Sequence, residues 1–130
     1  MNAKNYEKIK TLKVNYISSE LNLSPELAEV FWPIYNQYEK ENRELRSIKI
    51  RNIKVEIEQN GSIDNMSDKM ALELSKKFLK ISESYFENRK STFKKLEKIL
   101  PPQQLLKLNF VEMDFNQKVL RKLQRENSKK

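Results

Sequence analysis

Apolar residues recur along the chain at intervals of three and four, which is the spacing of one side of an α-helix. The clearest run predicts a helix over residues 25–59. The residues expected to face a partner helix are called the seam, which is interrupted by the polar residues Glu41 and Asn52. In order, the seam is Leu27, Phe31, Ile34, Tyr38, Glu41, Leu45, Ile48, Asn52 and Val55. Ser24 is expected to cap this helix and Pro25 to open its first turn. Pro33 lies inside it and is expected to bend it.

Three further segments show helical periodicity. They predict helices over residues 4–21, 67–100 and 102–126, and the tandem prolines 101 and 102 separate the last two. The expected apolar line of segment 67–100 is Leu74, Phe78, Ile81 and Tyr85, and that of segment 102–126 is Leu105, Leu108, Val111, Phe115, Val119 and Leu123. The long segments 25–59 and 67–100 are similar in length and are joined by a short polar turn around Gly61, so we expect an antiparallel helical hairpin. The predicted fold is all-α, with four helices in a single domain over residues 1–130.

The amino-acid composition excludes most of the familiar kinds of catalytic site. The 130 residues include one glycine and neither cysteine nor histidine. A glycine-rich phosphate loop, a thiolate nucleophile, a histidine-containing triad and a His or Cys metal site are therefore excluded. We expect a protein that is not an enzyme and that uses no cofactor and no metal.

Charge is concentrated towards the C-terminus. The net charge is +8, and residues 118–130 hold six basic side chains against Glu126: Lys118, Arg121, Lys122, Arg125, Lys129 and Lys130. This stretch fits a surface for acidic proteins or anionic lipid headgroups. It also fits a nucleic-acid patch, although no groove-reading motif accompanies it, or a plain solvated helix side that ends in a basic tail.

Two short boxes and an aromatic stretch resemble a known family. Leu23-Ser24-Pro25-Glu26-Leu27 and Leu100-Pro101-Pro102-Gln103-Gln104 stand where the Spy/CpxP-like periplasmic proteins carry two Leu-Thr-x-x-Gln boxes. Phe31-Trp32-Pro33-Ile34-Tyr35 follows the first box, as in the Bacteroidetes branch described as sensors of extracytoplasmic-function sigma factors. In both boxes the threonine is replaced, and the first box also lacks the glutamine.

This resemblance implies a cradle-shaped helical homodimer that binds unfolded or other envelope proteins without ATP, as a chaperone-like factor or a stress sensor. It also implies the periplasm, and hence a signal segment that was removed, because residues 1–4 do not form the apolar core of one. The cytoplasm is the alternative location. Metal sensing, which occurs in some relatives, is not carried over to a chain without His or Cys.

The candidate protein-binding residues each have a structural alternative. Trp32 and Tyr35 could line a surface for client proteins, or Trp32 could pack on the first helix while its neighbours Phe31 and Tyr38 fill the seam. Leu23 and Leu100 could contact a client, but hydrophobic stapling at a helix start is the favoured role. The basic candidates are Lys118, Arg121, Lys122 and Arg125.

Two other functional classes stay open. A helical nucleic-acid-associated protein would explain the basic charge and would bind with a steep salt dependence. A structural module that pairs its seam with one partner helix would explain the long periodic segments. Contact with an anionic membrane surface is a further expectation from the basic C-terminal stretch, whereas specific nucleic-acid binding is not expected.

Overall fold

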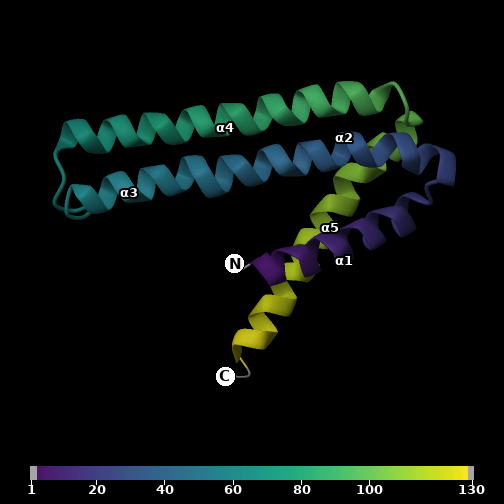
Figure 1. The fold of residues 1–130 in the computed structure, drawn as a ribbon, viewed down its shortest axis with the longest axis horizontal. Helices are drawn as coiled ribbons and strands as arrows, with labels where there is room; N and C mark the ends of the chain where they lie inside the picture. The colour runs from purple at the N-terminus through teal and green to yellow at the C-terminus, as the bar shows by residue number, and fades with distance from the viewer. Residues whose placement is uncertain (1–2, 129–130) are drawn as a thin grey trace. The chain divides into compact units, whose positions relative to one another are not determined.

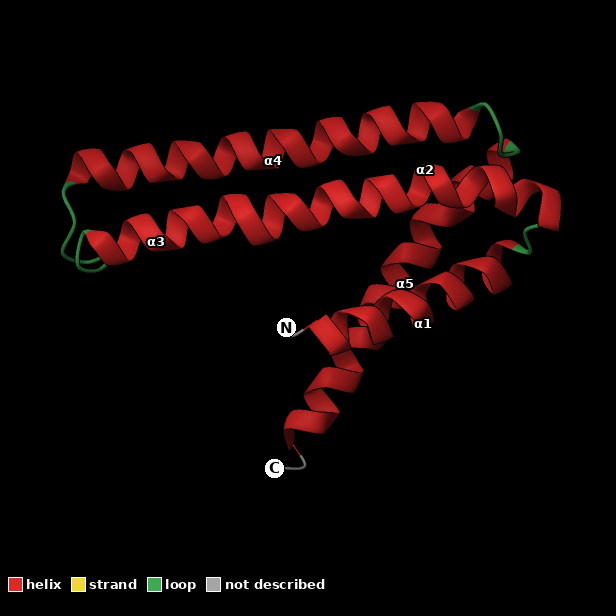
Figure 2. Ribbon diagram, viewed as in Figure 1, coloured by secondary structure: helices red, strands yellow, loops and turns green. Residues whose placement is uncertain are grey.

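The chain is all-α, as the periodicity predicts (Figures 1 and 2). The computed structural model describes residues 3–128, with side chains from Asn5 onward. The second of the four helices is continuous but contains a π-helical segment, so the elements in order are α1 (Ala3–Leu21), α2 (Pro25–Glu44), η1 (Leu45–Ile50), α3 (Arg51–Gln59), α4 (Asp68–Glu97) and α5 (Pro102–Ser128). The cradle arrangement stays a prediction.

Two serines begin the long helices, as helix-capping chemistry requires. The Oγ atom of Ser24 accepts a hydrogen bond from the backbone N–H of Leu27 at 3.2 Å, and Ser67 does the same for Met70 at 3.2 Å. Each bond satisfies one of the amide groups that a helix leaves unpaired at its N-terminus. The expected cap at Ser24 is confirmed, and Ser67 caps α4.

Asparagine supplies a helix ending that glycine usually supplies. Asn22 follows α1 with φ of 51°, in the left-handed region. The backbone N–H groups of Asn22 and Leu23 then donate to the carbonyls of Ser19 and Ser18, at 3.3 and 3.4 Å. This is the hydrogen-bond pattern of a Schellman motif, and asparagine tolerates its φ better than most residues. Gly61 has φ of 94° in the turn between α3 and α4.

The chain divides into two compact units. Residues 32–95 form one, here called the hairpin unit, and residues 1–31 with 96–130 form the other, here called the terminal unit. The division falls inside α2 and inside α4, so both helices contribute to both units. The expectation of a single domain over residues 1–130 stays a prediction.

In the hairpin unit the chain from α2 to α3 runs antiparallel to α4 (Figure 1). Ile53 of α3 is buried in one cluster with Leu74 and Ile81 of α4. Partly buried apolar side chains surround these three, namely Ile50, Ile57, Met66, Met70 and Tyr85. Burying such side chains is the main favourable term that holds the two helices together.

A polar layer follows the apolar cluster along the hairpin. The side-chain amide of Asn88 donates to the carbonyl of Tyr38 at 3.1 Å and to the Oδ1 atom of Asn42 at 2.8 Å. Tyr85 donates its hydroxyl to the carbonyl of Asn42 at 3.4 Å, and Arg89 donates to the hydroxyl of Tyr38 at 2.9 Å. These bonds join α2 to α4, and because only one alignment forms them, they fix how the helices lie along each other.

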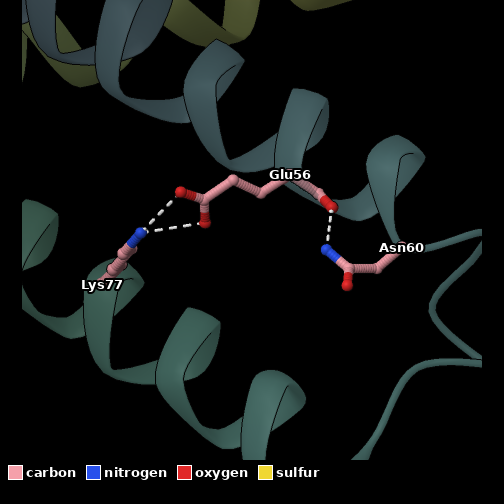
Figure 3. A network of polar contacts seen from close by, with 3 residues as sticks. All are labelled: Glu56, Asn60 and Lys77. Carbon is pink, nitrogen blue, oxygen red and sulfur yellow. Dashed lines mark hydrogen bonds and ion pairs between the residues drawn. The ribbon is translucent and has the colours of Figure 1, made fainter.

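Nearer the turn, an ion pair joins α3 to α4 (Figure 3). The ammonium group of Lys77 lies 2.8 and 2.9 Å from the two carboxylate oxygens of Glu56. The amide of Asn60 donates to the carbonyl of Glu56 at 2.8 Å and covers the end of α3. The pair is well exposed to solvent, so its contribution to stability is below about 1 kcal/mol.

The π-helical segment changes which residues of the second helix face α4. A regular α-helix continuing from Leu45 would bring Ile48, Asn52 and Val55, the line predicted from the sequence, to the interface. A π turn closes i→i+5 hydrogen bonds and so accommodates one extra residue. The buried line therefore steps by five residues from Leu45 to Ile50 and then continues through Ile53 and Ile57.

The predicted seam beyond Leu45 is consequently wrong. Ile48 is 53% exposed and Val55 is 42% exposed, and Asn52 is also exposed. The sequence pattern was extended at the α-helical repeat, whereas the inserted residue rotates the inward side by about 100°. Of the expected α4 seam, Leu74 and Ile81 are buried, but Phe78 is largely exposed.

In the terminal unit, α1 packs on α5. The rings of Tyr16 and Phe115 lie 5.8 Å apart, and Ile17 is fully buried. The side-chain amide of Gln104, near the start of α5, donates to the carbonyl of Leu21 at the end of α1 at 2.9 Å. Gln104 thereby satisfies a carbonyl that a helix leaves unpaired at its C-terminus, which is a structural role.

Replacing Ile53 by alanine should cost about 2–4 kcal/mol of unfolding free energy, because it opens a cavity in the hairpin cluster. Ile48→Ala removes the same atoms from an exposed position and should cost less than about 1 kcal/mol. Urea denaturation followed by circular dichroism measures both values. Equal losses would contradict the observed seam and favour the one predicted from periodicity.

Deleting Ser47 should leave the hairpin stable, because removal of one residue turns the π segment into regular α-helix and keeps the isoleucines of α3 facing α4. Deleting Ser82, also an exposed serine, rotates the second half of α4 and should cost at least about 2 kcal/mol. Thermal and urea unfolding of both variants test this. If deletion of Ser47 were as damaging as deletion of Ser82, the extra residue would not be what aligns the core.

Candidate binding surfaces

The aromatic candidates at the start of the hairpin unit lie mostly in its interior. The ring of Tyr35 is edge-on to Trp32 with centroids 5.8 Å apart, and 5.6 Å from that of Tyr38. Tyr35 is 1% exposed, so it presents no surface to a partner, and Trp32 is half-buried. The alternative in which Tyr38 fills the interface between the helices agrees with its burial.

The two leucines of the family-like boxes also have structural positions. Leu100 is 4% exposed and follows α4, just before Pro101 accepts the first backbone hydrogen bonds of α5. Leu23 is half-buried in the turn that ends α1 and begins α2. Both lie at connections between helices, and neither is among the large exposed apolar residues.

The basic candidates lie in the second half of α5. The ammonium of Lys118 is 3.2 Å from the hydroxyl of Tyr16 and 4.5 Å from the centre of its ring, a cation–π contact that ties it to α1. Arg121, Lys122 and Arg125 are exposed. Lys129 and Lys130, which belong to the same predicted basic stretch, lie outside the described residues.

A line of exposed apolar residues along α4 was missed by the sequence analysis. Leu72, Leu79 and Phe86 are 57%, 64% and 63% exposed and are seven residues apart. Seven residues are close to two helical turns, so the three side chains share one side of α4, opposite the side that meets α3. The seven-residue spacing is present in the sequence, but it accompanies a second apolar line through Leu74 and Ile81, and periodicity alone does not show which of the two lines faces solvent.

Here these three residues are called the outer stripe of α4. Ser75 and Ser82 lie between them on the same side of the helix and are exposed. Phe93 continues the seven-residue spacing but is half-buried, with the guanidinium of Arg89 4.3 Å from the centre of its ring. The stripe thus alternates large apolar side chains with small hydroxyls.

A second exposed line runs along α5 in the terminal unit. It is called the α5 stripe, and each of its residues is more than half exposed: Leu106, Phe110, Met113 and Leu120. Their spacing of four, three and seven keeps them on one side of the helix. The line predicted from the sequence for α5 is a different one, and its residues Leu108, Val111 and Phe115 are buried.

A shallow groove of about 240 Å³ lies between α2 and α4 within the hairpin unit. Its lining is mainly polar and comprises Pro33, Ile34, Gln37, Glu41, Asn88, Ser91, Thr92 and Lys95. These groups can form hydrogen bonds and one ion pair.

Among residues 3–128, no cluster of three or more His, Cys, Asp and Glu side chains is placed to hold a metal ion. Over the same residues, none of the helices combines the length and the apolar character needed to cross a membrane. The most distinctive exposed surfaces of the described residues are the two apolar stripes and the basic groups near them.

The chain matches no protein-family model, and neither curated proteins nor solved structures give a significant match. The resemblance to Spy/CpxP-like proteins, which rests on two short boxes and an aromatic stretch, therefore stays a prediction.

Proposed function

We propose that the protein is a non-enzymatic binding protein of the bacterial envelope that captures apolar segments of unfolded or partner proteins on the outer stripe of α4. The observation that carries the proposal is the stripe itself, three large apolar side chains exposed at a regular spacing. Large apolar side chains exposed together on one side of a helix mark an interaction site in many proteins. The envelope location rests on the family resemblance alone.

The shape of the stripe suits a polypeptide segment. Ser75 and Ser82 leave space between the large side chains, and apolar side chains of a partner can enter that space as knobs enter holes in helix packing. Because the stripe offers separate contacts and no deep pocket, it would select partners for their apolar side chains more than for a particular sequence. Such a surface favours reversible capture of many different segments.

Charge supports the encounter step. Lys76, Lys80 and Lys90 are exposed on α4, and the whole chain carries +8. A basic protein attracts acidic polypeptides over distances comparable to the Debye length, and this speeds association without fixing the bound geometry. Apolar contacts with the stripe would then hold the captured segment.

The wild-type chain, in stoichiometric amount and at low salt, should suppress aggregation of a reduced, unfolded client protein measured by light scattering. Leu79→Ser with Phe86→Ser should remove most of this protection, because it deletes two thirds of the stripe. The matched control, Ile48→Ser with Ile63→Ser, removes two equally exposed apolar residues elsewhere and should protect normally. No protection by the wild-type chain, or equal losses in both variants, would refute the proposal.

A second use of the same stripe is pairing with a second copy of the chain. The alternation of large residues with serines is self-complementary in an antiparallel arrangement, where Leu79 lies opposite Ser82 of the second copy and Phe86 opposite Ser75. The same register brings Lys76 near Glu83 of the second copy, twice by symmetry. A parallel arrangement would instead stack serine on serine, so the antiparallel homodimer is the favoured one.

Cysteine cross-linking can test this register, because the chain contains no other cysteine. A mixture of Leu79→Cys and Ser82→Cys chains should, on mild oxidation, give mainly the mixed disulfide dimer, identified by its mass. Ser84→Cys, at an exposed serine away from the stripe, is the control and should cross-link poorly. Predominance of the self-linked Leu79→Cys dimer would indicate a parallel pair, and an absence of cross-links would rule out self-pairing through α4.

A further inference from the structure

Helix α5 has two apolar sides, and only one of them is used inside the terminal unit. Leu108, Val111 and Phe115 are buried, and the ring of Phe115 packs on Tyr16 of α1. The α5 stripe lies on the other side of the helix, where Phe110 is 59% exposed and Met113 57%. The packing on α1 leaves this second apolar side facing solvent.

Basic groups border the α5 stripe on one side. Lys107 and Arg121 are fourteen residues apart, close to four turns, and Arg125 follows one turn later, so a helix places the three together. Asp114 is the one acidic residue among them. Residues 116–128 carry a net charge of +3, because they include one acidic residue, Glu126, and four basic ones, Lys118, Arg121, Lys122 and Arg125.

The opposite border of the stripe is polar and uncharged. Asn109 and Asn116 lie there, and the amide of Asn109 is bonded to the carbonyl of Leu105 within the helix. Around the outward half of α5, an uncharged polar zone is therefore followed by the apolar stripe and then by a basic zone. This is the pattern of a helix that lies in the plane of a membrane interface.

We propose that α5 binds an anionic lipid surface. The side chains of Leu106, Phe110, Met113 and Leu120 enter the boundary between headgroups and acyl chains, while Arg121, Arg125 and Lys107 bind headgroup phosphates. The charges are complementary, because anionic lipids attract basic residues next to an inserted helix. The contact is peripheral, since α5 lies along the surface and its other side stays packed on α1.

Gln117 favours a lipid surface over a partner helix. It falls in line with the stripe, between Met113 and Leu120, and is exposed. A partner helix would bury its amide between apolar side chains, where an unpaired polar group is costly. At a membrane interface the same amide can bond to water or to headgroup oxygens.

The inference does not rest on the proposed capture of polypeptides. The outer stripe of α4 belongs to the hairpin unit and the α5 stripe to the terminal unit. Substitutions can therefore remove one surface and leave the other intact, and each proposal can fail without the other.

Flotation of the full chain with phosphatidylcholine vesicles that contain phosphatidylglycerol tests the proposal. The wild-type chain should bind these vesicles, bind pure phosphatidylcholine vesicles at least tenfold more weakly, and dissociate as salt is raised. Phe110→Ser with Met113→Ser should lower the partition coefficient at least tenfold. Arg121→Gln with Arg125→Gln should lower it about 25-fold, since each basic residue near such a surface contributes about fivefold.

Two matched controls separate this surface from a general effect of charge or apolarity. Lys90→Gln with Lys94→Gln removes the same charge from α4, and Leu79→Ser with Phe86→Ser removes the α4 stripe, and both should leave vesicle binding within about threefold of the wild type. Failure of the wild-type chain to bind anionic vesicles would overturn the proposal. So would equal losses in the α4 and α5 charge variants.

Insertion can be observed directly with a single reporter. Phe110→Trp in a Trp32→Phe background gives the chain one tryptophan, whose emission should shift to the blue on anionic vesicles and be quenched by lipids brominated on the acyl chains. Binding without shift or quenching would overturn the insertion of the stripe. If the α5 variants instead lost binding to an acidic unfolded polypeptide while the wild-type chain ignored vesicles, α5 would be a polypeptide surface.

Discussion

The packing of Ile53 against Leu74 and Ile81 is the contact on which the far half of the hairpin depends. Two paired helices have no third layer to share, so each residue on the inward line of α3 must meet α4 directly. An inward line of Ile48, Asn52 and Val55 would place a polar residue at the centre of that interface and would leave Ile53 outside it. The π turn at Leu45–Ile50 avoids this by adding one residue, and the short-range cost of a π turn is offset by the burial that it permits.

The polar layer completes the alignment that the apolar cluster begins. Apolar contacts are tolerant of small slips along a helix pair, whereas the amide of Asn88 reaches both Tyr38 and Asn42 in one register only. The hairpin thus combines a non-directional attraction near the turn with directional bonds further along. In the terminal unit Gln104 has a comparable part, because its amide links the start of α5 to the last turn of α1.

A helix pair buries one side of each helix, and this limit leaves the other side to be explained. In most helices that side is polar, but α4 and α5 carry large apolar residues there, Leu79 and Phe110 among them. The inward contacts use only one side of each helix, so the exposed apolar residues on the other side point to interactions with other molecules. Both proposals follow from these exposed apolar residues. The partner that suits each stripe depends on the charges that border it and on the residues that lie between its apolar side chains.

The sequence by itself determined the helical class, the four helices and nearly all their ends, because these depend on local chemistry: capping by Ser24, the prolines before α5, and the near absence of glycine. It also located the basic groups of α5. Only the tertiary structure decided that Ile53, and not Ile48, faces α4, and that Tyr35 and Leu100 are interior while Leu79 and Phe110 are exposed. One reason is that a helix with apolar residues on two sides can pack with either side facing inward. Another is that a single inserted residue, as in the π segment, changes which side of the following helix faces its partner. That choice depends on which side finds a partner helix, and no local signal in the chain contains it.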